Sequence, residues 1–287
     1  MPCNYGKIDL HMHSTISDGT DTPEELLKKV KSAGIAVFSV TDHDAIKTAP
    51  ILWEILKDDD PRLITGVEFS CKDEKGKYHI LGYGFDPAAA SMRELVDRSH
   101  SIRMNKILAR LEGLKTEYGF SFPEEQVAKI LTMENPGKPH IGRLMVECGY
   151  VQTIAEAFEK YLDHIHVPVA APVRPEEAIR AILAGGGIPV LAHPFYGSGN
   201  ELILGDEMEE RLDRMMEFGL QGVEAFYSGF SEKLREKMLE TAKRRALYVT
   251  AGSDYHGANK LVKLGDTGLD SVAEMPEGLC RFLKKLL

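Results

Sequence analysis

Short apolar runs alternate with longer amphipathic stretches along most of the chain. Strands are predicted at 8–10, 35–40, 63–69, 78–85, 188–192, 222–226 and 247–251. Helical patterns occupy 22–34, 175–184, 206–218 and 232–245, with Asp21 or Thr22 placed to cap the first and Gly34 to end it. This alternation is typical of βα units and predicts an α/β fold with a mostly parallel sheet or barrel. About seven strands favour a barrel over an open sheet, and the pattern alone leaves closure open.

The stretch from 91 to 167 breaks this alternation, because only helical patterns occur in it. We interpret it as a helical insertion, a lid or substrate subdomain, set into an α/β body formed by residues 1–90 and 168–287. Prolines at 168, 172 and 175 mark the return to that body.

Composition narrows the class of protein. The chain has 287 residues, of which 43% are hydrophobic and 28% charged, so collagen-like, disordered and coiled-coil proteins are excluded. Charged residues interrupt every apolar run well short of a membrane span, and no secretory signal precedes the first histidine pair. Four scattered cysteines without CxxC pairing fit a reducing compartment, so we expect a cytoplasmic protein without a membrane partner.

The net charge of −9 argues against a stable partnership with long nucleic acid, which would require a basic surface. It is compatible with a small anionic substrate if metal ions supply positive charge locally.

Histidines and acids gather where the predicted strands end. Six of the ten histidines lie at or just beyond these ends: His11, His13, His43, His79, His193 and His256. Four acids occur at the same ends: Asp18, Asp42, Glu68 and Asp254. In parallel α/β folds this edge carries the active site, and imidazole with carboxylate suits Zn²⁺, Mn²⁺ or Fe²⁺. A single histidine is more often structural, but six in this arrangement indicate a metal site. Asp42, next to His43, is predicted to orient a ligand rather than to bind metal.

These motifs resemble, in their order, the PHP (polymerase and histidinol phosphatase) family. They are His-Met-His at 11–13, Asp18, Thr-Asp-His-Asp at 41–44, Gly-Val-Glu at 66–68, His79, Ala-His-Pro at 192–194 and Gly-Ser-Asp-Tyr-His at 252–256. The metallo-β-lactamase pattern HxHxDH fails because Ser14 and Thr15 follow His13. Amidohydrolases, which also begin with HxH, lack the later motifs and rank second.

The resemblance implies a distorted (βα)7 barrel of the PHP type that holds three divalent ions, Mn²⁺, Fe²⁺ or Zn²⁺. It implies one ion on His11, His13, Glu68 and Asp254, a second on Glu68, His79 and His193, and a third on Asp18, His43 and His256.

Members with a helical insertion are similar in acting on nucleotide phosphates, and their insertion motif resembles residues 137–151. That likeness implies substrate-binding roles for Arg143 and His140, which share a helix face. Lys138 could contribute, and His100, His164 and His166 match no motif. Tyr227 and Ser228 lie at the edge that would meet substrate, where packing is an equal alternative.

Taken together, these features predict a metal-dependent phosphoesterase that hydrolyses phosphate mono- or diesters of small nucleotides, such as 3′,5′-bisphosphates or short RNA ends. Metal-activated hydroxide would attack phosphorus, with Glu68, His256 and Arg143 as catalytic candidates. The alternatives are an amidohydrolase acting on a C–N bond, histidinol phosphatase, and a regulatory or proofreading module. Neither eroded ligands nor an attached polymerase supports the last of these.

Overall fold

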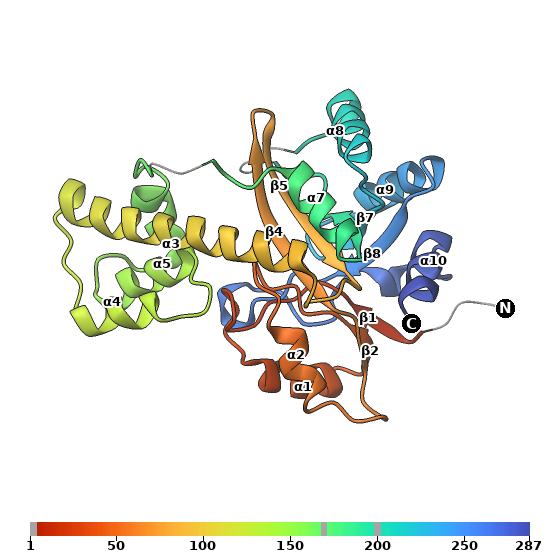
Figure 1. The fold of residues 1–287 in the computed structure, drawn as a ribbon, viewed down its shortest axis with the longest axis horizontal. Coiled ribbons are helices and arrows are strands. Elements are labelled where there is room, and N and C mark those ends of the chain that lie inside the picture. Colours follow the sequence, from red (N-terminus) through yellow and green to blue (C-terminus); the bar gives the residue numbers. More distant parts are fainter. Residues whose placement is uncertain (1–4, 168–170, 198–201) are drawn as a thin grey trace.

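Two sheets form the frame of the computed structural model, which describes residues 5–167, 171–197 and 202–287 (Figure 1). The small sheet holds three parallel strands: β1 (Lys7–Asp9), β2 (Ile35–Phe38) and β3 (Arg62–Leu63). The large sheet holds, in order, β4 (Gly66–Asp73), β5 (Gly76–Tyr83), β6 (Ile188–Leu191), β7 (Gly222–Tyr227) and β8 (Tyr248–Gly252). β5 runs antiparallel to both of its neighbours, whereas β6, β7 and β8 are parallel. The fold is therefore α/β with mixed sheets.

The segments that follow the strands connect the two sheets. The Leu10 N–H donates to the Ala251 carbonyl at 2.8 Å, so the segment after β1 runs along β8. The Asp44 N–H donates to the Glu68 carbonyl at 2.9 Å, so the segment after β2 reaches β4. These bonds bring the strand-end motifs of both sheets to one place.

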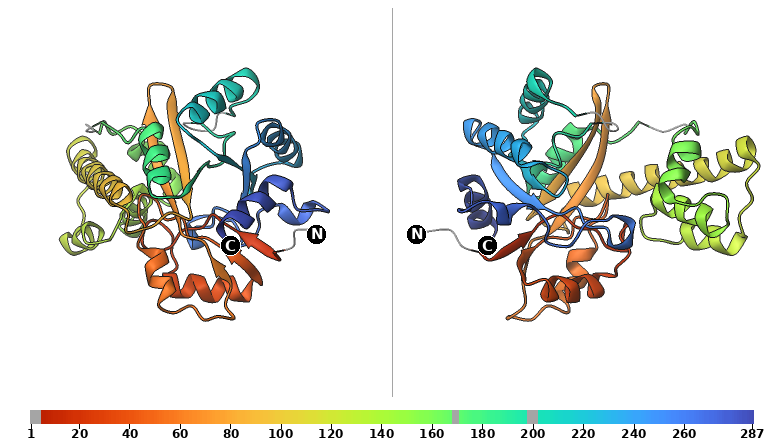
Figure 2. Two further views of the ribbon diagram at one scale, coloured as in Figure 1. Left: turned by 45° about the vertical axis from the view of Figure 1, so that its right-hand side comes forward. Right: turned by 180° about the vertical axis from the view of Figure 1, so that it is seen from behind.

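Six helices surround the sheets. They are α1 (Pro23–Ser32), α2 (Thr48–Trp53), α7 (Pro175–Ala184), α8 (Gly205–Glu217), α9 (Glu232–Arg244) and α10 (Glu277–Leu286). Helices α7, α9 and α10 pack against β5, β7 and β8 respectively, on the outer side of the large sheet (Figures 1 and 2). Thr22 is the residue that caps α1, because its side chain accepts from the Glu25 N–H and Glu25 bonds back. Short 3-10 helices follow at Gly257–Asn259 and Leu269–Ser271.

The segment predicted to be helical is helical in the structure. Helix α3 (Ala90–Tyr118) extends away from the sheets, and α4 (Glu124–Leu131), α5 (Lys138–Glu147), α6 (Ile154–Ala157) and a π-helical turn (Phe158–Leu162) gather beside its far half (Figure 2). Met92 and Ile102 at the near end of α3 pack into the core of the sheets. Ile107 and Leu114 belong to a separate apolar cluster with α5. Within the described residues, no helix is long and apolar enough to cross a membrane.

The β4–β5 hairpin is the main departure from the predicted parallel pattern. The single strand expected at 63–69 is divided into β3 and β4, and β4 continues to Asp73 before turning back as β5. Glu68 and His79 therefore lie inside strands rather than at strand ends. Because β5 runs antiparallel to β4 and β6, it begins at the edge of the sheet where these two strands end. His79 on β5 therefore still reaches the other histidines.

Candidate metal centre and adjoining cleft

Glu68 on β4 is the centre of the histidine cluster. Five imidazole nitrogens lie within 3.3 Å of its two carboxylate oxygens. On Oε2 these are His11 Nε2 (3.1 Å), His13 Nε2 (3.2 Å) and His43 Nδ1 (3.3 Å), and on Oε1 they are His79 Nδ1 (2.8 Å) and His193 Nε2 (3.3 Å). A carboxylate that faces imidazoles with both oxygens can bridge two neighbouring metal positions.

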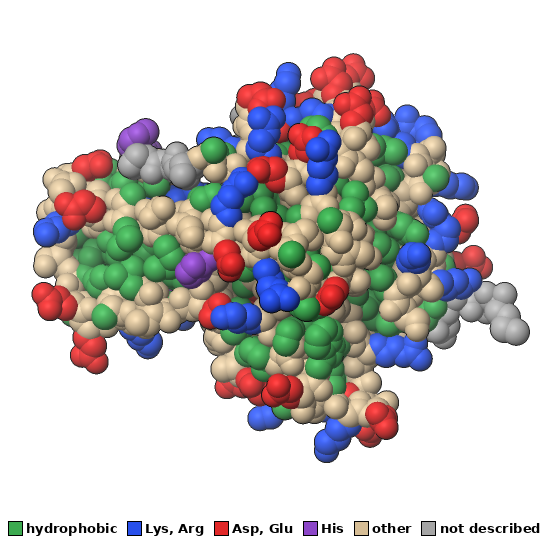
Figure 3. All heavy atoms as spheres, in the orientation of Figure 1, with side chains coloured by type: hydrophobic (Ala, Val, Ile, Leu, Met, Phe, Trp, Pro, Cys, Tyr) green, Lys and Arg blue, Asp and Glu red, His purple; other side chains and the backbone are tan. Residues whose placement is uncertain are grey.

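Three overlapping groups of side chains present ligand atoms close enough together to hold a metal ion. They are His11, His13, Glu68 and Asp254; His13, Asp18, His43 and His256; and His43, Glu68 and His79. His193 joins the last group, since its Nε2 lies 3.2 Å from His79 Nδ1. The structure thus brings together all nine residues that the resemblance implies. Few histidines reach the face drawn in Figure 3, in keeping with the burial of this cluster.

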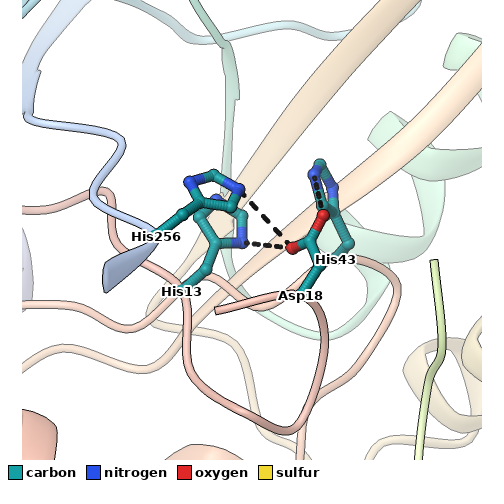
Figure 4. A group of neighbouring side chains, drawn as sticks. All are labelled: His13, Asp18, His43 and His256. Atoms are coloured by element: carbon teal, nitrogen blue, oxygen red, sulfur yellow. Dashed lines mark ion pairs between the residues drawn. The ribbon is translucent and has the colours of Figure 1, made fainter. Parts of the chain in front are cut away.

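Asp18 organises the second group (Figure 4). Its Oδ1 lies 3.5 Å from His256 Nε2 and 3.8 Å from His13 Nδ1, and its Oδ2 lies 4.0 Å from His43 Nε2. These separations are too long for strong hydrogen bonds and leave room for a cation between the groups.

The backbone at two cluster residues adopts a conformation that non-glycine residues rarely take. His193 has φ 27° and Asp254 has φ 58°. The Asp254 N–H donates to the His11 carbonyl at 2.7 Å, and the His193 N–H donates to Glu224 Oε2 at 2.8 Å. Such strain costs roughly 1–3 kcal/mol per residue and persists where surrounding bonds hold it, most often at functional sites.

Glu224 on β7 belongs to the cluster, although the sequence analysis missed it. It is fully buried, and its Oε1 accepts from His11 Nδ1 at 2.9 Å. A proton on Nδ1 leaves the Nε2 lone pair of His11 free to bind a metal. The one available signal was an acid inside the apolar run Gly222–Tyr227.

Asp42 braces the loop that carries Asp18. Its carboxylate accepts from the Ser14 N–H at 2.8 Å, from the Ser14 and Ser17 hydroxyls at 2.7 Å each, and from the Thr48 hydroxyl at 2.5 Å. Among the predicted ligands, Asp42 therefore positions Asp18, whose loop carries Ser14 and Ser17, rather than the adjacent His43.

The cluster is strongly coupled electrostatically. Burial opposes the charge of Glu68, but the nearby His11, His43 and His79 outweigh it and hold the pKa of that carboxyl well below its usual range. Burial likewise opposes a charge on His13, yet the adjacent carboxylates of Asp254 and Glu68 raise the pKa of His13 to about 9. The carboxylates therefore create a site that attracts cations, whether protons or metal ions.

The donor set fits a metal ion. Both ring nitrogens of His13 and Nδ1 of His43 are buried and make no hydrogen bond of normal geometry within the described residues. Buried polar atoms without partners are rare in native proteins, and ligation of a metal would satisfy these three.

Comparison with known proteins now decides the family. The model of the PHP domain matches residues 9–275. The chain belongs to the PHP domain family. It is 30% identical over 269 residues to a 5′-3′ exoribonuclease of Haemophilus influenzae, covering 90% of this chain and 93% of that protein. It is also 30% identical over 271 residues to a 3′,5′-nucleoside bisphosphate phosphatase of Chromobacterium violaceum, covering 87% of each.

Two solved structures resemble the PHP chain over its whole length. A Bifidobacterium adolescentis protein, provisionally classed as a metal-dependent phosphoesterase, has a TM-score of 0.83 at 26% identity and covers 100% of this chain and 98% of its own. An amidohydrolase from Chromobacterium violaceum, with bound sulfate and no metal, has a TM-score of 0.81 at 27% identity and covers 98% and 97%.

Helix α5 of the PHP chain begins against the cluster. A Cβ added at Gly137, its N-cap, would lie 3.8 Å from the Asp18 Cβ. Arg143 donates to the Asn259 side chain, which in turn donates to the Asp18 carbonyl at 2.6 Å. Arg143 is exposed at the rim, whereas His140 Nδ1 accepts from the Gly137 N–H at 2.9 Å and so caps its own helix.

Tyr227 and Lys260 contact the cluster through Asp254. The Tyr227 hydroxyl donates to Asp254 Oδ2 at 3.0 Å, and Lys260 forms an ion pair with the same oxygen. Of the two edge residues singled out in the sequence, Tyr227 therefore touches the site.

A cleft of about 490 Å³ separates the metal-centre residues from α3 and α5. Asp18, His43 and His79 form part of its lining. Its basic residues are Lys77, Arg103, Lys106, Arg110 and Lys138. Sequence analysis considered only Lys138 of these, because the helical pattern of α3 gave no reason to distinguish its inner cations from solvated ones.

Proposed function

We propose that this PHP protein is a metal-dependent phosphoesterase that hydrolyses phosphate mono- or diesters of small nucleotides. The observation that carries the proposal is Glu68, whose two oxygens face five imidazoles. The named activities of its relatives, a 5′-3′ exoribonuclease and a 3′,5′-nucleoside bisphosphate phosphatase, support a phosphoester substrate.

We assign three divalent ions, Mn²⁺, Fe²⁺ or Zn²⁺, to the cluster. His11, His13, Glu68 and Asp254 would hold one, Glu68 with His79 and His193 a second, and Asp18, His43 and His256 the third. When bound, such ions activate water for attack on phosphorus and stabilise the charge of the transition state.

The protein's own residues then position the substrate and move protons. Glu224 fixes the tautomer of His11 through Nδ1. Arg143 is placed at the rim, where a guanidinium can bind phosphate oxygens, and His140 lies on the same helix beside it. His256 serves either as a ligand or as the proton donor to the leaving oxygen, since its Nε2 faces Asp18.

The distorted (βα)7 barrel with an inserted subdomain remains our interpretation of the architecture. The backbone bonds between the two sheets support closure, and the separate apolar cluster beside α3 supports a subdomain at 91–167 set into a body at 1–90 and 168–287.

An amidohydrolase is the second candidate, because one solved relative bears that name. Hydrolysis of a neutral amide offers no use for a cleft lined by five basic residues next to the metal centre. The cleft therefore favours an anionic substrate.

A substrate panel on the Mn²⁺-loaded protein tests the proposal. It holds adenosine 3′,5′-bisphosphate, a 5′-mononucleotide with a 3′ ester, short RNA, histidinol phosphate and a set of cyclic amides. Phosphate or nucleotide release from the nucleotide substrates is expected. Preferential hydrolysis of histidinol phosphate would correct the substrate, and hydrolysis of amides alone would overturn the phosphoesterase.

A further inference from the structure

Two cations of the cleft stand out by their position. Lys106 and Arg110 lie four residues apart on α3, so they share one face of the helix, and both line the cleft. Both side chains are half-buried. They lie on the wall formed by the insertion, whereas the histidines lie on the wall formed by the sheets.

Neither of these cations has an anionic partner among the described residues. Neither forms an ion pair, and Arg110 Nε is buried without a hydrogen bond. The other cleft cations differ, because Arg103 is paired with Asp44 and Lys138 with Asp163. Burial lowers the pKa of both Lys106 and Arg110, and the attraction of Asp44 for Lys106 and of Asp163 for Arg110 offsets it only in part.

Removing a cation from water without a counter-charge is costly, and a fold retains such a residue where a ligand supplies the charge. A phosphate is the anion that suits this pair, since a guanidinium binds it with two parallel bonds and an ammonium adds a point charge. The beginning of α5 at Gly137 lines the same cleft and adds the partial positive charge of a helix N-terminus.

We propose that Lys106 and Arg110 bind a second phosphate of the substrate, distinct from the phosphate hydrolysed at the metal centre. The inference rests on the proposed phosphoesterase function and narrows its substrate class. The preferred substrate carries at least two phosphate groups, as a nucleoside bisphosphate or a short oligonucleotide does, and a substrate whose only phosphate is hydrolysed leaves the second site empty.

The test uses the full-length, metal-loaded protein with Lys106→Gln and Arg110→Gln combined, which removes both charges and keeps most of the side-chain bulk. Two values are measured: KM for adenosine 3′,5′-bisphosphate and KM for p-nitrophenyl phosphate, whose single phosphate must lie at the metal centre to be hydrolysed. Loss of charge-assisted contacts raises KM for the bisphosphate about 10- to 100-fold. KM for p-nitrophenyl phosphate changes by less than about 3-fold, because this substrate has no phosphate for the second site.

Lys115→Gln is the matched control, since Lys115 is an exposed cation of the same helix outside the cleft lining. It leaves both constants unchanged. Metal content and melting temperature, measured for every variant, establish that the centre and the fold are intact, and Lys106→Gln alone replaces the double variant if that one unfolds.

Three results separate the outcomes. A double variant with an unchanged KM for the bisphosphate overturns the second site, and so does an equal loss for the bisphosphate and p-nitrophenyl phosphate, which would place the scissile phosphate there. Wild-type protein that hydrolyses no phosphoester overturns the proposed function instead. In that case dissociation constants of the two phosphoesters by calorimetry replace KM and test the cleft under the same expected ratio.

Discussion

Glu224→Gln tests the contact that sets the chemistry of His11. Glu224 is fully buried on β7, and its two oxygens accept from His11 Nδ1 at 2.9 Å and from the His193 N–H at 2.8 Å. Glutamine has the same shape, but only one of its two terminal atoms accepts a hydrogen bond. One of the two donors must then face an amide NH2 group, and the negative charge beside His11 is lost.

The structure sets the expected magnitudes. A buried donor without an acceptor costs about 1–3 kcal/mol, and at about 2–4 °C per kcal/mol for a large domain this lowers the melting temperature by roughly 2–12 °C. Loss of the partner that orients a metal-binding histidine typically lowers metal affinity about 10- to 100-fold. Glu224→Gln should therefore weaken metal binding more than its modest loss of stability suggests.

Two measurements check this expectation. Melting temperature is recorded with and without metal, and Mn²⁺ affinity is measured by competition with a chelator. Glu236→Gln on the exposed face of α9 is the control for the loss of one negative charge. A Glu224→Gln protein that binds Mn²⁺ as tightly as the control would refute the reasoning, because Glu224 would then be a structural acceptor only.

Three further predictions follow from the cluster and its rim. Glu68→Gln should lower metal content and reduce activity by at least ~10²-fold, because the carboxylate shared by two metal positions is lost. Metal content and kcat are measured on one preparation, and wild-type values for both would contradict the prediction. Arg143→Ala should lower kcat/KM for phosphorylated nucleotides at unchanged metal content, and only about 10-fold, because the exposed position of Arg143 weakens its contact with phosphate. Unaltered kinetics on every phosphoester would show that Arg143 does not bind the substrate. In metal-free protein the pKa of His13 is raised to about 9, against about 6.5 in the unfolded chain. Its contribution to the free energy of unfolding, roughly 3 kcal/mol, is therefore complete below pH 6.5 and is lost as the pH rises through 9. A free energy of urea unfolding that is independent of pH between 6.5 and 9.5 would contradict this prediction.

The sequence predicted which residues gather around Glu68 far better than the path of the backbone around them. Most of the nine residues lie in a strand or within a few residues of its end, so their distance along the chain from that strand fixes their position. The π-helical turn at Phe158–Leu162 and the β4–β5 hairpin were not predicted. An apolar run is compatible with parallel and antiparallel pairing, and only tertiary contacts select between them.

Contacts between distant segments account for what the sequence missed. Glu224 is 213 residues from His11 along the chain, so no local pattern links the two residues. An acid within a strand can equally well pair with a residue outside the histidine cluster. The sequence could not tell which ligand Asp42 orients, because its partners Ser14, Ser17 and Thr48 come from other segments. The cationic cleft is similarly a property of two helices and a hairpin brought together, and no single segment encodes it.

Metal dependence of phosphate release is the most direct test of the central claim, that the cluster around Glu68 is a metal centre for phosphoester hydrolysis. Protein stripped with a chelator is titrated with Mn²⁺, and phosphate released from adenosine 3′,5′-bisphosphate is measured at each step. The account predicts no release without metal and a rise that saturates near three equivalents per chain. Release that persists in the stripped protein, or none with Mn²⁺, Fe²⁺ or Zn²⁺, would contradict it.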